Sequence, residues 1–292
     1  MNRFAHFDCS SGVSSDMLLG ALLHFVGDAD AVAAELRGLG LCEFRLRVNT
    51  VERKGVTGYA AAVEIASPPA GGARAESTPS HGRHERDHSH GHDHDDDHHH
   101  HHTHIAYRDV AALISDADIG SKAKGYALAA YRALAEAEAA AHGTTTDEIH
   151  FHEVGSPRAI YTVTGAAIAA ELIGVTDFTC GALTDGSGSV ECAHGTIPVP
   201  VPAVRELLKQ TEIPLVSDPA IKTELVTPSG LALLIGFGCR YVKSDAVPSG
   251  ESGPFNPSDP FARNESPVTG YGFGSRDTGL LGAVRAVLSR TR

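Results

Sequence analysis

Residues 67–103 constrain the fold of this chain more than any other segment, because they contain almost no apolar side chain. Pro, Gly, Ser, Asp and His dominate this tract. Such a segment cannot bury enough apolar surface to offset the entropy of ordering its backbone. We therefore expect a long disordered loop that divides the chain. An amino-terminal α/β unit over residues 1–66 precedes it, and a larger α/β remainder over 104–292 packs on that unit.

Hydrophobic patterning on both sides of the tract predicts a mixed α/β fold. Residues 3–9 alternate as a short strand, and the apolar residues after the next polar turn predict a buried helix over 16–26. A second helix over 29–39 and two strands over 44–52 and 59–66 complete the first unit. In the remainder we expect helices over 107–117, 121–143, 159–174, 203–210 and 229–238, and a strand over 281–288.

Charge and cysteine usage exclude several classes of protein. A formal net charge of -12 would repel nucleic acid and anionic membrane surfaces. The amino terminus lacks the apolar run of a signal peptide, and no stretch of about 20 apolar residues could span a bilayer. The 5 cysteines include no CxxC pair, so we expect free thiols, a cytoplasmic location and no disulfide framework.

Histidines are concentrated in the tract. Twelve of the 18 histidines lie between residues 81 and 104, interleaved with aspartates. Neutral imidazole is a good ligand for nickel, copper, zinc and cobalt, and a flexible segment can wrap an ion with whichever nitrogens reach it. We interpret the tract as a metal-capturing segment, with a solvated linker or an engineered tag as the alternatives. Its histidines are His81, His84, His88, His90, His92, His94, His98, His99, His100, His101, His102 and His104.

The segment IHFHEVG, residues 149–155, offers a pair of metal ligands outside the tract. In an extended strand His150 and His152 point to one face, whereas Phe151 and Glu153 point to the other. Two imidazoles on one face could share an ion. The alternative is a pair of surface histidines at the end of a helix pair.

The first strand has a similar pattern. His6 and Asp8 share a face, and the strand leads into the turn SSGVSSD at the start of a helix. Exposed N–H groups and the helix dipole favour an anion there, so we expect a phosphate to bind at Ser11, Gly12 and Ser14. The alternative is that Ser14 only caps its helix.

Two further segments carry weaker signals. Cys192 and His194, in ECAHG, place a sulfur and an imidazole on one face of an extended segment, although a packing role for the cysteine is an open alternative. Gly-rich turns, at Gly186 to Gly188 and at 270–274, could approach a nucleotide closely. Neither turn forms a dinucleotide fingerprint or a Walker loop, so no dehydrogenase or kinase is indicated.

Seven blocks of unusual sequence follow one another along the chain. They are FDCSSGVSSDMLLGALL, the His-rich insert, LAEAEAAAHG, HFHEVG, ECAHGTIPVPVPAVRELL, ELVTPSGLALL and YGFGSRD. Together and in this order they resemble the LarC family of nickel-insertion proteins. The resemblance implies a nickel chelatase of the lyase type. Its substrate would be a pyridinium mononucleotide with two thiocarboxylates, the precursor of the nickel-pincer cofactor of lactate racemase. It also implies dependence on CTP with Mg or Mn.

The same resemblance implies roles for the residues that match the family's motifs. The ordered ligands for Ni(II) would be His6, His150, His152, Cys192 and His194. The groups that move protons would be Asp8, Asp16 and Glu153. The contacts to the mononucleotide would be Ser11, Gly12 and Ser14 of the first turn, and the Gly-rich turn described above adds Gly186 and Gly188 independently of the resemblance.

Three departures from the family's pattern bear on these roles. Two aspartates four residues apart usually follow HEVG, whereas this chain has Arg158 and Thr162 there, which removes two carboxylates from one helical face. Ser15 stands where a glycine of the first turn is usual. Full-length members continue into a CTP-binding domain, so CTP would reach this chain only through a separate domain or carboxy-terminal subunit.

Two other functions stay open at this point. The chain could be a non-enzymatic nickel store or chaperone that kept the His-rich tract, or it could be a scaffold for a CTP-binding partner. We expect a homo-oligomer whose partners are nickel and the cofactor precursor rather than nucleic acid or membrane.

Overall fold

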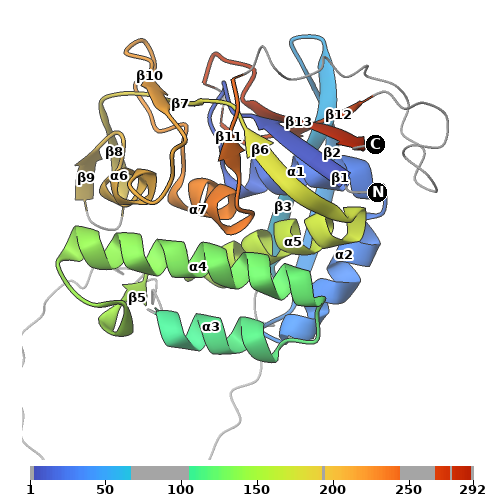
Figure 1. Ribbon diagram of the computed structural model, residues 1–292, viewed down its shortest axis with the longest axis horizontal. Coiled ribbons are helices and arrows are strands. Elements are labelled where there is room, and N and C mark those ends of the chain that lie inside the picture. Colours follow the sequence, from blue (N-terminus) through green and yellow to red (C-terminus); the bar gives the residue numbers. More distant parts are fainter. Residues whose placement is uncertain (1–2, 67–104, 193–194, 244–266, 277, 291–292) are drawn as a thin grey trace, which may run out of the picture.

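The computed structural model describes residues 3–66, 105–192, 195–243, 267–276 and 278–290 (Figure 1). The loop predicted over 67–103 lies outside these residues, and so do all twelve histidines of the tract and His194. The described residues form a mixed α/β body, which confirms the predicted fold class.

A seven-stranded mixed sheet is the framework of the fold, in the order β11-β6-β1-β13-β12-β3-β2. β1 is parallel to β6 and antiparallel to β13, while β12 joins β13 to β3. One sheet therefore contains strands from both sides of the 67–103 tract, and the domain boundary at residue 66 stays a prediction. The strands are β1 (Arg3–Asp8), β2 (Phe44–Arg53), β3 (Val56–Ile65), β6 (Val175–Cys180), β11 (Arg240–Tyr241), β12 (Val268–Phe273) and β13 (Ala283–Arg290).

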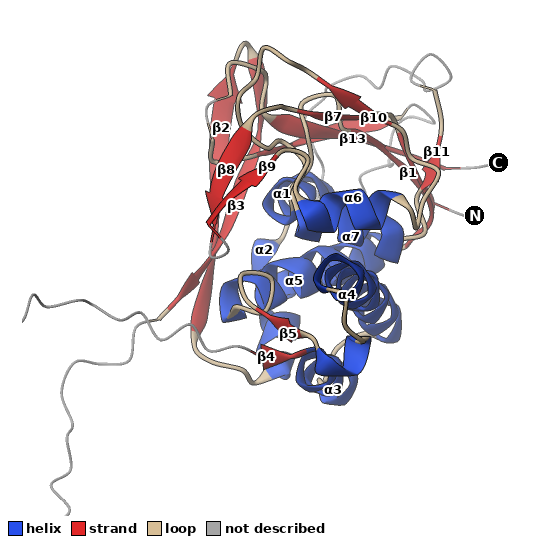
Figure 2. Ribbon diagram, turned by 90° about the vertical axis from the view of Figure 1, so that its left-hand side faces the viewer, coloured by secondary structure: helices blue, strands red, loops and turns tan. Residues whose placement is uncertain are grey.

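Helices gather on one side of this curved sheet, with α1 nearest the strands and α3 farthest from them (Figure 2). They are α1 (Ser15–Val26), α2 (Ala29–Leu36), α3 (Tyr107–Asp116), α4 (Ser121–His142), α5 (Pro157–Ile173), α6 (Pro202–Leu208) and α7 (Pro228–Gly236), with 3-10 turns η1 (Arg37–Leu39) and η2 (Thr146–Glu148). Among the described residues, no helix is long and apolar enough to cross a bilayer.

Three two-stranded sheets border the helices and carry segments of functional interest. They are β4 (Ile105–Ala106) with β5 (His150–Phe151), β7 (Leu183–Asp185) with β10 (Leu215–Ser217), and β8 (Ser189–Cys192) with β9 (Gly195–Pro198).

Helix α1 shows how the local sequence sets the fold. Ser14 caps it by accepting a hydrogen bond from the Met17 backbone N–H at 3.3 Å, and Gly27 ends it in the left-handed conformation at φ 70°. Its four leucines are all buried, and each contributes about 1.5–3 kcal/mol to stability. The predicted helix over 16–26 is confirmed to within one residue.

The turn predicted at 270–274 is wrong, because β12 runs through most of it. Its glycines serve packing rather than turning. A Cβ added to Gly270 would lie 2.9 Å from the Cβ of His24, and one added to Gly272 would meet the backbone of Met17. Helix α1 thus packs directly on the backbone of β12, and only glycine leaves room for it.

Candidate functional site

Two clefts meet at Glu224, Thr227 and Arg276, which line both of them. We name the larger one, of about 520 Å³, the histidine cleft, after His142, His150 and His152 in its wall. The smaller one, of about 120 Å³, is the serine cleft, lined by Ser11 and Ser14. A more open depression of about 720 Å³ beside the β2–β3 hairpin contains none of the predicted site residues, so we do not assign the chemistry to it.

His150 lies at the start of β5 with its ring held by the backbone. Its Nδ1 is 3.0 Å from the carbonyl oxygen of Glu148. A carbonyl only accepts, so Nδ1 carries the proton and Nε2 keeps its lone pair in the neutral ring. A hydrogen bond of this kind orients a histidine for metal binding.

Glu153 lies in the wall of the same cleft as His150 and His152. Strand alternation predicts the opposite face for Glu153, and that prediction is wrong. The strand ends at the buried Phe151 and a turn follows, so the alternation stops there. Three potential ligands of the HFHEVG motif therefore line one cavity.

Tyr131 of α4 holds the turn after β5 in place, a role that was not predicted from the sequence. Its hydroxyl donates to the carbonyl of Val154 at 3.0 Å, and the ring is fully buried. Burial raises the pKa of Tyr131, so the hydroxyl keeps its proton as a donor. No motif marks this tyrosine; only its position on the buried face of a helix singles it out.

The carboxyl end of α4 contributes a glutamate–histidine pair to the wall of the histidine cleft, which was not among the predicted site residues. Nε2 of His142 lies 3.6 Å from Oε2 of Glu138, one helical turn earlier, and both residues line the histidine cleft. The i, i+4 spacing of a glutamate and a histidine was visible in LAEAEAAAHG. On its own, that spacing is typical of any solvated helix.

The serine cleft forms where the amino termini of α1 and α7 come together. Ser15 Oγ lies 3.1 Å from Ser229 Oγ, and Thr227 caps α7 as Ser14 caps α1. Asp16 also lines this cleft. Burial raises the pKa of Asp16, and the positive charge of Arg158 partly opposes that shift.

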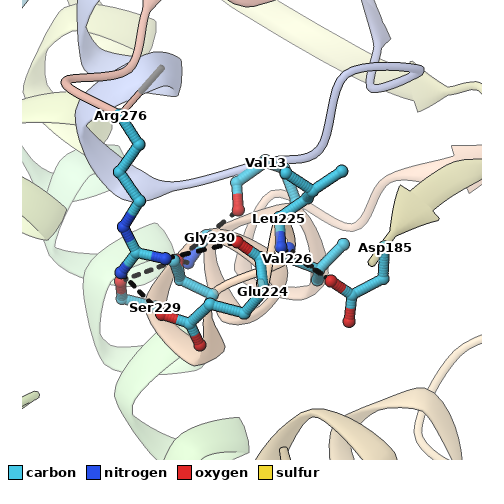
Figure 3. Close-up of polar contacts among 9 residues, drawn as sticks. Val13, Asp185, Glu224, Leu225, Val226, Ser229, Gly230 and Arg276 are labelled. Carbon is cyan, nitrogen blue, oxygen red and sulfur yellow. Dashed lines mark hydrogen bonds and ion pairs between the residues drawn. The ribbon is translucent and has the colours of Figure 1, made fainter. Parts of the chain in front are cut away.

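Arg276 and Glu224 form an ion pair at the meeting point of the two clefts (Figure 3). Nη2 of the arginine lies 2.7 Å from Oε1 of the glutamate, and Nη1 donates to the Glu224 carbonyl at 3.2 Å. Glu224 and Arg276 belong to the sequence blocks ELVTPSGLALL and YGFGSRD, which predicted no role for either residue. Their pairing over 52 positions is a product of the fold.

Asp185 supports the segment that carries Glu224. It is fully buried, and its Oδ1 accepts hydrogen bonds from the N–H groups of Gly186, Leu225 and Val226 at 2.7–3.2 Å. Figure 3 shows this carboxylate on the opposite side of the segment from Arg276. Sequence reasoning missed it because an aspartate before a Gly-rich stretch is typical of an ordinary turn.

The glycines predicted to contact a nucleotide have packing roles here. Gly186 and Gly188 lie against the segment 221–223, and neither lines the histidine or the serine cleft. Gly12 has φ 89°, and a Cβ there would lie 2.6 Å from the Cβ of Leu225. These contacts join the first turn to the segment that Asp185 holds.

His6 and Asp8 lie on the sheet and line neither cleft. Nδ1 of His6 is 2.9 Å from Thr179 Oγ1, in a buried contact between β1 and β6. Asp8 faces Arg285 across the β1–β13 pair, with Oδ2 3.5 Å from Nε. The structure does not bring these two residues to the other predicted ligands.

Cys192 ends β8 beside the histidine cleft, because Glu191 of the same strand lines that cleft. The backbone of Cys192 pairs with Gly195 across the hairpin. Its predicted partner His194 lies outside the described residues. Within the described ranges no three histidine, cysteine or acidic side chains are close enough to form a ready-made metal centre. The histidine cleft thus offers nitrogen and oxygen donors around an open space.

Comparison with known proteins gives consistent matches. The family model for the nickel insertion protein matches residues 5–292. The pyridinium-3,5-bisthiocarboxylic acid mononucleotide nickel insertion protein of Lactiplantibacillus plantarum is 36% identical over 284 residues, which is 97% of this chain and 60% of that protein. The protein of the same description from Acetivibrio thermocellus is 32% identical over 291 residues, 99% of this chain and 61% of that protein.

The chain thus spans about half to three fifths of the length of the curated relatives it matches. No solved structure matches it.

Proposed function

The chain belongs to the nickel insertion protein family, and from that premise we propose that it inserts nickel into, or delivers nickel for, the pyridinium-3,5-bisthiocarboxylic acid mononucleotide. One observation carries the proposal: His150, His152 and Glu153 line a single cleft whose volume, about 520 Å³, can admit a mononucleotide. Nickel and the mononucleotide are both substrates of this reaction.

Nickel binds first to imidazole, in this proposal. The Nε2 lone pair of His150 is available because Nδ1 is engaged with Glu148, and His152 lies two residues away on the same wall. Histidine nitrogens are good ligands for nickel. A closed site of four protein ligands would retain the ion instead of passing it on. An open set of donors leaves coordination positions for the two sulfurs of the substrate.

Insertion also requires a proton acceptor. When nickel bonds to the ring carbon, the carbon–hydrogen bond breaks, its electron pair forms the nickel–carbon bond, and a proton leaves. Glu153 is the proposed acceptor, because it lies on the same cleft wall and its carboxylate is exposed. Asp16, at the serine cleft, is the second candidate acid–base group.

Helix α5 does not supply ligands in this proposal. Thr162 is only 1% exposed, and its hydroxyl donates to the Arg158 carbonyl at 2.8 Å. Arg158 is exposed and cationic, so it cannot bind a metal ion. The two carboxylates usual after HEVG thus have no equivalent here, and the turn after β5 takes their place.

CTP with Mg or Mn is proposed to act through a separate segment or subunit, because the match leaves 39–40% of the length of the two relatives above uncovered. We place the reaction in the cytoplasm, where the free thiols Cys9, Cys42, Cys180 and Cys239 stay reduced. A homo-oligomer stays a prediction.

The decisive experiment is nickel calorimetry at neutral pH on the intact chain and on a variant that lacks residues 81–104. We expect the deletion variant to keep a single tight site, which the double substitution His150→Ala and His152→Ala removes. His6→Asn is the matched control, because His6 lines neither cleft.

Loss of all nickel binding on deletion alone would contradict insertion by the folded body. The twelve histidines of the tract would then be the sole nickel sites, and storage or delivery would replace insertion as the function.

A further inference from the structure

Arg276 lines both the histidine cleft and the serine cleft, which together form one cavity. Among the described residues that line the histidine and serine clefts, it is the only lysine or arginine. The other charged groups there are carboxylates, such as Glu138, Glu153 and Glu191 in the histidine cleft. The carboxylates of the histidine cleft thus favour a metal cation, and a single fixed cation stands where that cleft meets the serine cleft.

The guanidinium of Arg276 is held on one side and open on the other. Two of its N–H groups reach Glu224, whose side chain is only 14% exposed, whereas the arginine side chain is 54% exposed. A guanidinium has five N–H donors in a planar fork. Within the described part of the chain, three donors are left for a ligand, in the geometry that suits a phosphate or a carboxylate.

The wall of the serine cleft favours the same kind of ligand. The hydroxyl oxygen of Thr278 is buried there without a hydrogen-bond partner among the described residues. Such a buried hydroxyl gains free energy from an acceptor brought by a ligand. Ser14 and Thr227 mark the amino termini of α1 and α7 in this wall, so two helix dipoles add positive potential.

Two carboxyl groups face this pocket and work against an anion. Glu224 forms an ion pair with Arg276 and offsets part of its charge. Asp16 is the other, and burial raises its pKa, which favours the neutral acid that can donate a hydrogen bond. The attraction for an anion therefore comes from the remaining N–H donors of the guanidinium fork, the Thr278 hydroxyl and the two helix amino termini.

We infer that Arg276 anchors an acidic group of the pyridinium mononucleotide, so that its ring extends toward His150 and His152. This inference rests on the proposed function and names the side of the cavity where the substrate is held. The acidic group is either the phosphate or a ring thiocarboxylate, for which the carboxylate of a stable analogue stands in, since both suit the same fork.

Binding of three stable analogues without metal tests the inference. Nicotinic acid mononucleotide carries both groups, nicotinamide mononucleotide carries only the phosphate, and nicotinic acid riboside carries only the carboxylate. Calorimetry on the full chain would compare wild type, Arg276→Gln and Arg276→Lys. The matched control is Arg240→Gln, because Arg240 is an exposed arginine paired with Asp177 and lines neither cleft.

Arg276→Gln should weaken binding about ten- to hundred-fold, the effect of losing a charge-assisted pair. The affinity of Arg276→Lys should lie between those of wild type and Arg276→Gln, because lysine keeps the positive charge but lacks the planar fork of donors. Weakening of both mononucleotides but not the riboside assigns the phosphate; weakening of both nicotinic acid compounds but not the amide assigns the carboxyl. Arg240→Gln should bind as wild type does.

Equal binding by wild type and Arg276→Gln would overturn the inference, and so would a wild-type chain that binds none of the three analogues. Nickel titration of the same variants separates this failure from that of the proposed function. Arg276→Gln should keep the tight nickel site, whereas loss of that site in the tract deletion would overturn the proposed function.

Discussion

The carboxylate of Asp185 accepts a hydrogen bond from the backbone N–H of Leu225 at 2.7 Å, although the two residues are 40 positions apart. The same oxygen accepts from Val226 at 3.2 Å. Glu224 precedes these two residues and pairs with Arg276, so the position of that arginine depends on a buried carboxylate that lines neither cleft (Figure 3).

Asp185→Ala should lower the free energy of unfolding by about 2–4 kcal/mol, because three buried N–H groups lose their acceptor. Urea denaturation followed by circular dichroism measures the change. Asp28→Ala is the control, since Asp28 caps α2 through two exposed bonds and its loss costs about 1 kcal/mol. Equal losses in the two variants would show that Asp185 has no special structural role.

Gly230→Ala should separate the ends of α1 and α7. A Cβ on Gly230 would lie 2.7 Å from the Cα of Ser14, so the helices must move apart, at a cost of about 1–3 kcal/mol. Binding of mononucleotides should weaken in parallel. The control Gly125→Ala, at an exposed position of α4, meets nothing within 4 Å and should stabilise the fold by about 0.5–1 kcal/mol. A neutral Gly230→Ala would contradict close packing at this contact.

His6 should make the protein less stable in mild acid. Burial lowers the pKa of His6 below its ordinary 6.5, so below that pH the unfolded chain binds more protons than the folded one. The free energy of unfolding should therefore fall as the pH drops through 6.5, and His6→Asn should flatten this slope. Burial lowers the pKa of His24 as well, so His24→Asn should remove a separate part of this dependence of the free energy of unfolding on pH. An unchanged slope in both variants would refute this account.

Local signals predicted the helices of this fold well. Gly143 ends α4 with φ 68°, at the residue where the sequence predicts the stop, because glycine adopts the left-handed conformation without strain. Strand β12 was missed, since Gly270 and Gly272 are typical of turns and only contact with α1 explains them. Close packing between distant elements leaves no local mark in a sequence.

Only part of the site could be predicted, because some of its residues share a local motif whereas others meet only through the fold. The motif HFHEVG marks His150, His152 and Glu153, and the structure places all three in one cleft. The pairing of Arg276 with Glu224 depends instead on sheet order. The chain that leaves β12 places Arg276 beside the segment whose backbone Asp185 binds. A single sequence carries no information on such a contact between residues 52 positions apart.

The pairing of β1 with β13 bears on how the polypeptide is made. Ribosomes add about 5–20 residues per second, so β1 leaves the exit tunnel roughly tens of seconds before the strand it must join. During that time one edge of a central strand is unsatisfied, and an apolar strand with a free edge invites association with other chains. The sheet is therefore completed late, when the synthesis of β13 supplies the strand that joins β1 to β12.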